Sequence, residues 1–222
     1  MARRHLSVIR KGPSFRRRPG SKPPRSVTLI VCEGETERIY FQAARQRYRL
    51  TTAEVVIADN TKGSAPESVV QLAEEKYRDD DGYDKVFCVF DRDDHESYQR
   101  ARDRIVHLRM RSRNPMPIDD AISWPCFEVW ILLHYERTDR PFNRCAEVIQ
   151  RIRQDHIPAY EKTDDEIASS LMERVDTAIA NADWLANRAQ ITNHNPFTAV
   201  HAVILHFSSV SERNDADDTD PR

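Results

Sequence analysis

Acidic residues follow two of the predicted strands, at the point where each strand ends. Glu33 comes directly after the apolar run VTLIVC, and Asp91 and Asp93 come directly after KVFCVF. In an open parallel α/β sheet, the carboxyl ends of the strands meet at one edge, and ligands bind there. Mg²⁺ and Mn²⁺ prefer oxygen ligands and often take only a few carboxylates, with water and phosphate completing the shell. We therefore expect Glu33, Asp91 and Asp93 to bind a divalent cation if their strands are neighbours.

The same acids have a second, structural interpretation. Asp93 or Asp94 could cap the next helix, with Glu96 as the reciprocal member of a capping box. Glu37 could complement the dipole of the helix that follows Glu33. The i, i+2 spacing of Asp91 and Asp93 points both side chains the same way on an extended chain. Acids at two strand ends in one crevice favour a cation, because like charges packed together without one repel each other.

Apolar strand patterns alternate with amphipathic helix patterns through the first part of the chain. We expect strands over 27–32, 53–58 and 85–90, a short one within DDAISWP, and a buried helix over CFEVWILLHY. This alternation predicts an α/β fold, a mainly parallel sheet flanked by helices on both faces. Beyond about residue 141 only helices are expected, including 164–190 and 198–207. The expected organisation is a basic arm over 1–26, an α/β core over 27–140, a helical C-terminal annex over 141–208 and an acidic, disordered tail over 209–222.

Composition limits the classes of protein. The 222 residues suit one principal domain, and no apolar run approaches the roughly 20 residues that span a bilayer. We expect a cytoplasmic protein with no membrane contact. The four cysteines are scattered without a CxxC pair, and we expect all of them to be reduced, buried and structural. They are Cys32, Cys88, Cys126 and Cys145.

Basic charge is concentrated at the N-terminus. Residues 1–26 hold nine Lys and Arg residues and no acid, although the whole chain has a net charge of −2. Arg16, Arg17 and Arg18 could lie along nucleic-acid phosphates, or the arm could be a solvated tail. Tyr160 and Lys162 are further candidates for phosphate contact, although a surface position is the default for both.

Longer motifs carry a family resemblance. LIVCEGETE followed by VFDRDD resembles the Toprim signature, in which a Glu-Gly and an Asp-x-Asp follow two strands and hold magnesium. Together with ISWPCFEVWILLHY, AYEK and HNPFTAVH, the chain resembles RloB-like proteins encoded beside restriction loci. The resemblance runs from residue 27 to about 207 and implies a Toprim-like, Rossmann-like core. Trp124 and Phe197 depart from it, since the family usually has Asn and Ser there.

The resemblance also implies an activity. Glu33 would be the general acid or base, Asp91 and Asp93 the ligands of Mg²⁺ or Mn²⁺, and Glu37 a second acid. Glu128, within PCFEVW, is either a further ligand or the partner of an Arg in a buried salt bridge. The implied function is a metal-dependent nuclease of phage defence or restriction, working with an ATPase partner. The alternative is a non-catalytic subunit that binds nucleic acid or regulates such a system. DNA and RNA substrates are not distinguished by these motifs.

Overall fold

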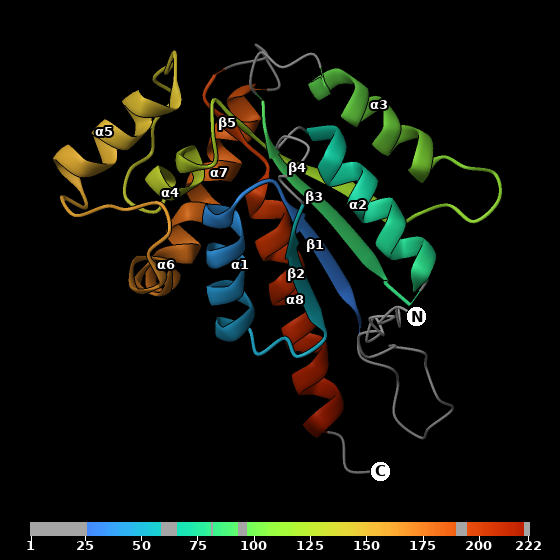
Figure 1. Ribbon diagram of the computed structural model, residues 1–222. Coiled ribbons are helices and arrows are strands. Elements are labelled where there is room, and N and C mark those ends of the chain that lie inside the picture. The colour runs from blue at the N-terminus through green and yellow to red at the C-terminus, as the bar shows by residue number, and fades with distance from the viewer. Residues whose placement is uncertain (1–25, 59–65, 81, 93–96, 190–194, 220–222) are drawn as a thin grey trace, which may run out of the picture.

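The computed structural model describes residues 26–58, 66–80, 82–92, 97–189 and 195–219. They form a five-stranded sheet in the order β2-β1-β3-β4-β5, flanked by helices (Figure 1). The strands are β1 (Thr28–Cys32), β2 (Ala53–Ile57), β3 (Lys85–Asp91), β4 (Ile118–Trp124) and β5 (Phe197–Thr198). The helices are α1 (Glu35–Arg47), α2 (Pro66–Asp79), α3 (Ser97–Arg109), α4 (Glu128–Leu133), α5 (Cys145–Asp155), α6 (Asp165–Leu171), α7 (Val175–Ala189) and α8 (Val200–Thr219), with a 3₁₀ turn at Met172–Arg174.

The central strands are those with the most continuous apolar runs. β1 lies between β2 and β3 and is parallel to both, and β4 continues the parallel order. All five residues of β1 are buried, as expected for a strand covered on both faces. β5 is antiparallel to β4 and is the one part of the sheet that the strand patterns did not predict. The expected α/β class, a mainly parallel sheet flanked by helices, is confirmed.

Alternating side chains of the strands build two cores. On one face, Leu29, Val31 and Phe90 pack with apolar residues of α2 and α3. On the other face, Ile30 and Val89 pack with α1, α4, α7 and α8. Figure 1 shows α2 and α3 on one side of the sheet and the remaining helices on the other. Because successive side chains of a strand point to opposite faces, each of these helices packs on one face or the other.

α8 packs on the sheet and is longer than the sequence pattern predicted. Its His206 ring contacts Phe87, and the Nε2 of that ring lies 2.9 Å from Oγ1 of Thr28. The C-terminal helices therefore share the core on this face of the sheet. The helix also continues to Thr219, where a disordered tail was expected from residue 209. Val210 is only 2% exposed, so packing continues the helix beyond Phe207. No helix in the described ranges has the length and apolar character needed to cross a membrane.

Two of the cysteines are paired, contrary to the expectation that all four are reduced. Cys126, just before α4, and Cys145, the first residue of α5, form a disulfide with a Cα–Cα distance of 5.6 Å. Cys32 and Cys88 are free and buried within strands, as expected. The pairing could not be seen in the sequence because the two cysteines are 19 residues apart and meet only when α5 packs beside α4.

Candidate functional site

Glu33 and Asp91 come together at the carboxyl ends of neighbouring strands. Cys32 lies opposite Val89 in the parallel register of β1 and β3, which confirms the predicted adjacency of these strands. The backbone N–H of Glu33 donates to the Val89 carbonyl at 3.0 Å. The backbone N–H of Asp91 in turn donates to Oε2 of Glu33, also at 3.0 Å. The Glu33 carboxylate is therefore turned toward the end of β3.

Glu37 joins this edge from the first turn of α1. It is only 6% exposed, and its Oε2 lies 3.0 Å from the point where a Cβ on Gly34 would stand. Gly34 is the N-cap residue of α1 and has an extended backbone that any residue adopts, so its value here is the space it leaves. The glycine of the Glu33-Gly34 pair thus makes room for the Glu37 carboxylate.

The acids at this edge oppose one another's ionisation. Burial raises the pKa of Glu37 from 4.5 to about 7, and the charges of Glu128 and Glu33 add to that shift. Burial also raises the pKa of Asp91 well above its ordinary value, with further contributions from Glu37, Glu33 and Glu128. We call Glu33, Glu37, Asp91 and Glu128 the acidic cluster. Its members are close enough to repel, so a cation placed among them would be stabilised.

Asp91 carries the clearest sign of a missing partner. The residue as a whole is partly exposed, but its Oδ1 is buried and has no hydrogen-bond partner among the described residues. A buried carboxylate oxygen without a donor is costly, and native proteins rarely leave one unexplained. Its surroundings supply carboxylates, which are the ligands that Mg²⁺ and Mn²⁺ take. Asp91, Glu33 and Glu37 are therefore ligands of the type that a hard divalent cation takes, although their oxygen atoms do not all lie within 4.8 Å of one another in this structure.

Glu128, a buried member of the acidic cluster, forms an ion pair with the partly exposed Lys162. Glu128 begins α4 and is 1% exposed, and its Oε1 lies 2.8 Å from Nζ of Lys162, whose side chain is 49% exposed. The sequence had suggested an Arg partner for Glu128, and the structure supplies Lys162 instead. The Lys162 charge also lowers the pKa of Glu37 and Asp91. One lysine therefore offsets part of the negative charge of the whole cluster.

Tyr160 was a candidate for phosphate contact with a surface position as the default, and the structure buries it beside the acidic cluster instead. It is only 2% exposed, and its hydroxyl is buried without a hydrogen-bond partner within the described ranges. Burial raises the pKa of Tyr160, and the charges of Glu128 and Glu37 add to the shift. The Tyr160 hydroxyl therefore interacts electrostatically with the acidic cluster. The spacing to Lys162 in AYEK is the signal that could have placed both residues there.

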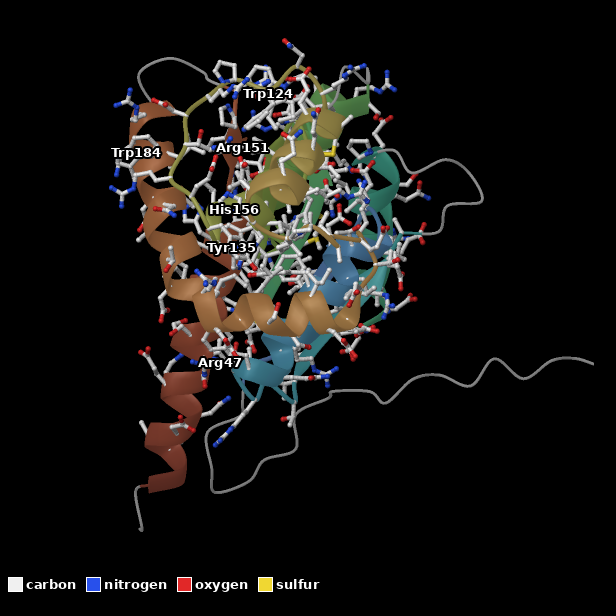
Figure 2. The ribbon with its side chains drawn as sticks, turned by 90° about the vertical axis from the view of Figure 1, so that its left-hand side faces the viewer. Arg47, Trp124, Tyr135, Arg151, His156 and Trp184 are labelled. Carbon is white, nitrogen blue, oxygen red and sulfur yellow. A yellow bond between two sulfur atoms is a disulfide. The ribbon has the colours of Figure 1, made fainter. Side chains whose placement is uncertain are left out.

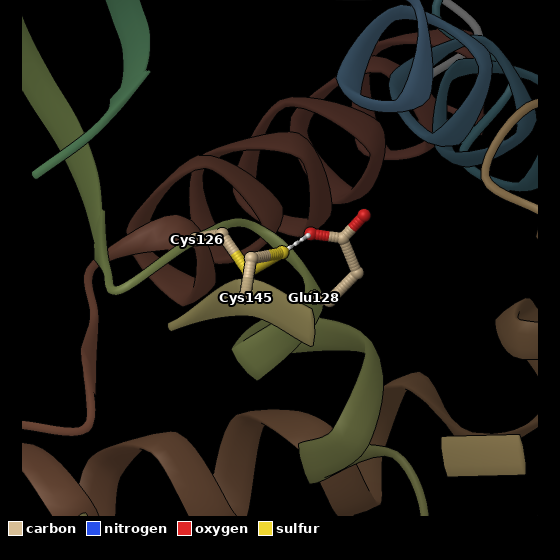
Figure 3. Close-up of side chains that lie close together, drawn as sticks. All are labelled: Cys126, Glu128 and Cys145. Atoms are coloured by element: carbon tan, nitrogen blue, oxygen red, sulfur yellow. Dashed lines mark hydrogen bonds between the residues drawn. A yellow bond between two sulfur atoms is a disulfide. The ribbon is translucent and has the colours of Figure 1, made fainter. Parts of the chain in front are cut away.

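Two sulfur atoms also lie beside Glu128, next to its second carboxylate oxygen and close to Lys162. Sγ of Cys145 is 3.0 Å from Oε2 of Glu128, and Figure 3 shows the carboxylate pointing at the disulfide. Among the described residues, Cys126, Glu128 and Cys145 are the three potential ligands whose atoms all lie within 4.8 Å of one another. The carboxylates of the acidic cluster interact without converging so closely.

Trp124 marks the rim of the same edge. It ends β4, and Figure 2 shows it at the opposite end of the molecule from Arg47, where α1 ends. The guanidinium of Arg92 lies 3.9 Å from the centroid of the Trp124 ring.

Four predicted site residues, Asp93, Arg16, Arg17 and Arg18, lie outside the described residues, so their predicted roles stay predictions.

Comparison with known proteins gives the family. Searches of curated proteins and of solved structures found no match. A family model described as RloB-like protein matches residues 28–207. The match spans most of the chain and includes both ends of the candidate site, from Glu33 to the segment with Tyr160 and Lys162. The chain therefore belongs to the RloB-like protein family.

Proposed function

We propose that this RloB-like protein is a Toprim-type nuclease that uses Mg²⁺ or Mn²⁺ to cleave DNA or RNA in the cytoplasm, in phage defence or a restriction-associated system. The observation that carries the proposal is the buried Oδ1 of Asp91, which has no hydrogen-bond partner in the described part of the chain. Three further carboxylates act on it electrostatically, so the strongest unmet requirement at this edge is for positive charge.

The residues divide the chemistry between binding and proton transfer. Glu33, Asp91 and Asp93 would hold the cation, which when bound neutralises charge on a phosphate and lowers the pKa of a water molecule. Glu33 acts as general acid or base, with its carboxylate oriented by the Asp91 N–H. Glu37 is a second acid, because a pKa of about 7 allows a carboxyl group to take up and release a proton at neutral pH.

In this proposal, cationic side chains contact the phosphates of the nucleic acid. Lys162 is half exposed at the edge of the acidic cluster, so its ammonium group is placed to meet a phosphate oxygen. Arg16, Arg17 and Arg18 would add phosphate contacts that do not depend on sequence. An ATPase partner is part of the proposal on the strength of the family resemblance alone.

A cleavage assay tests the proposal directly. The purified chain is incubated with plasmid, single-stranded DNA and total RNA in Mg²⁺, Mn²⁺ or EDTA, with and without the neighbouring ATPase. We expect metal-dependent cleavage of at least one substrate, and none by an Asp91→Ala protein. Equal binding of nucleic acid by both proteins with no cleavage under any condition would support the alternative, a non-catalytic subunit that binds nucleic acid or regulates the system.

A further inference from the structure

We infer that Cys126 and Cys145 are a reversible redox pair that sets the divalent-cation affinity of the acidic cluster through Glu128. The effect on cleavage rests on the proposed function, whereas the redox chemistry and the effect on cation binding do not. The disulfide of the two cysteines lies on one side of Glu128, with one cysteine just before α4 and the other at the start of α5 (Figure 3). No other described cysteine is placed to take part, because Cys32 and Cys88 are free and buried in the sheet.

The two sulfur atoms differ in access. Cys126 is only 3% exposed, whereas Cys145 is partly exposed at the N-terminus of an 11-residue helix. A small or protein dithiol would therefore attack Sγ of Cys145, break the disulfide and release Cys126 as a thiolate that takes up a proton. The second thiol of the reductant then closes its own disulfide and releases Cys145. In total two electrons and two protons pass from the dithiol to the pair.

The surroundings of Cys145 favour this release. Nζ of Lys162 lies 3.9 Å from Sγ, and the first N–H groups of α5 lie at the same end of the helix. An ammonium group and a helix N-terminus both stabilise negative charge on a departing sulfur. Once the sulfur is free, the Glu128 carboxylate 3.0 Å away favours its protonation to the thiol. A disulfide set among apolar side chains alone would lack this assistance.

The oxidation state changes the hydrogen bonding of Glu128. Its Oε1 pairs with Lys162, and its Oε2 lies 3.0 Å from Sγ of Cys145. A disulfide sulfur has no hydrogen, so it cannot donate to Oε2, whereas the thiol of reduced Cys145 can. Reduction therefore gives this carboxylate, which is 1% exposed, a hydrogen-bond donor in addition to its ion pair with Lys162, whose geometry at Oε1 does not make a hydrogen bond. Since a carboxylate with more donors attracts a cation less, we expect the reduced protein to bind a cation in the cluster more weakly.

A purely structural disulfide would behave differently. It would tie α5 to α4 and change the free energy of unfolding, but it would leave cation binding in the folded protein unaltered. A soft-metal site is a second rival, since two thiolates and a carboxylate are ligands that Zn²⁺ accepts. The test must separate all three roles.

The experiment uses the full chain in two forms, oxidised with glutathione disulfide or reduced with dithiothreitol that is then removed. Peptide mapping without reductant verifies the Cys126–Cys145 link, and calorimetry measures Mn²⁺ binding. We expect the oxidised form to bind Mn²⁺ roughly threefold to tenfold more tightly, a difference of up to about 1.4 kcal/mol. The Cys145→Ser protein should bind Mn²⁺ with the affinity of the reduced form, because a serine hydroxyl also donates to Glu128. Its Mn²⁺ affinity should not change with the oxidant, because it cannot form the disulfide.

Three results would overturn the inference. They are failure of the disulfide to form, equal Mn²⁺ affinity in both forms, and stoichiometric, tight Zn²⁺ binding by the reduced protein that competes with disulfide formation. The comparison of the two wild-type forms needs no substitution, so a poorly folding serine variant does not decide it. Absence of cleavage in both forms, with the affinity difference intact, would refute the proposed function and leave this inference standing.

Discussion

The backbone N–H of Asp91 donates a hydrogen bond to Oε2 of Glu33, 3.0 Å away, across the ends of two parallel strands. This bond fixes one oxygen of Glu33 with a donor from the main chain, which no side-chain substitution at residue 91 removes. The side chain of Asp91 has the opposite character, because its Oδ1 is buried and has no partner among the described residues. The two acids should therefore respond differently to substitution.

Asp91→Ala and Glu33→Gln should both abolish cleavage, but for different reasons. Removing the Asp91 carboxylate removes a cation ligand, so Mn²⁺ affinity should fall by at least roughly tenfold. The glutamine that replaces Glu33 keeps an oxygen that accepts from the Asp91 N–H but cannot titrate, so Mn²⁺ still binds while turnover falls roughly 10²- to 10⁴-fold. Calorimetry and a cleavage assay on both proteins check this. Undiminished cleavage by the Asp91→Ala protein would remove Asp91 from the site.

The metal-free protein should lose stability as the pH rises through 7. Glu37 has a folded-state pKa of about 7 against an ordinary 4.5, so the folded chain binds more protons than the unfolded chain between these values. Its contribution is thus fully present below about pH 4.5 and is lost as the pH passes 7, by roughly 3 kcal/mol at most. The raised pKa of Asp91 acts in the same direction.

Thermal melts in EDTA between pH 5.5 and 8.5 measure this loss. Mg²⁺ or Mn²⁺ should restore the Tm most at the high end, where the carboxylates are ionised. Glu37→Gln is the matched control, because it keeps the shape of the side chain and should flatten the pH dependence. A metal-free Tm that rises steadily through pH 7 would contradict the prediction.

Gly34→Ala should weaken the site without unfolding the protein. The backbone there is extended and suits alanine, but the new Cβ would stand 3.0 Å from Oε2 of Glu37. The buried carboxylate must shift, and we expect roughly tenfold lower cleavage with a small change in Tm. In a double-mutant cycle the effect of Gly34→Ala should disappear in a Glu37→Ala background, which lacks the carboxylate that the new Cβ meets. Equal losses in both backgrounds would mean that the alanine acts elsewhere.

The strand ends were predictable from the sequence because each signal is local. VTLIVC and KVFCVF are continuous apolar runs, and parallel α/β topology brings their ends to one edge. These rules placed Glu33 and Asp91 together before any coordinates. Whether the two strands are neighbours was a topological inference, and it is confirmed.

The rest of the site depends on packing between distant segments. Glu128, Tyr160 and Lys162 meet only because α5 folds back against α4 and returns the following segment to the sheet edge. No local pattern encodes that return, so Tyr160 was assigned to the surface by default. The Cys126–Cys145 link was missed for the same reason. β5 was missed because two residues give no periodicity.

Lys162 and Glu128 provide the sharpest test of how charge is balanced at the site. Their ion pair at 2.8 Å has one buried member and one half-exposed member, so the two single substitutions are not equivalent. Lys162→Met leaves the Glu128 carboxylate buried without its cation, and we expect a loss of stability of roughly 3 kcal/mol. Glu128→Gln leaves a lysine that can turn to solvent, and the loss should be roughly 1 kcal/mol or less. Urea unfolding in EDTA measures both.

The double variant separates stability from function. Glu128→Gln combined with Lys162→Met should recover most of the stability lost by Lys162→Met alone, because no buried charge remains unpaired. Cleavage should not recover, since the double variant still lacks the ammonium group proposed to contact a phosphate. Lys162→Arg, which keeps the charge, should retain part of the activity. If the double variant regained both stability and cleavage, the pair would be a structural salt bridge and Lys162 would have no part in binding nucleic acid.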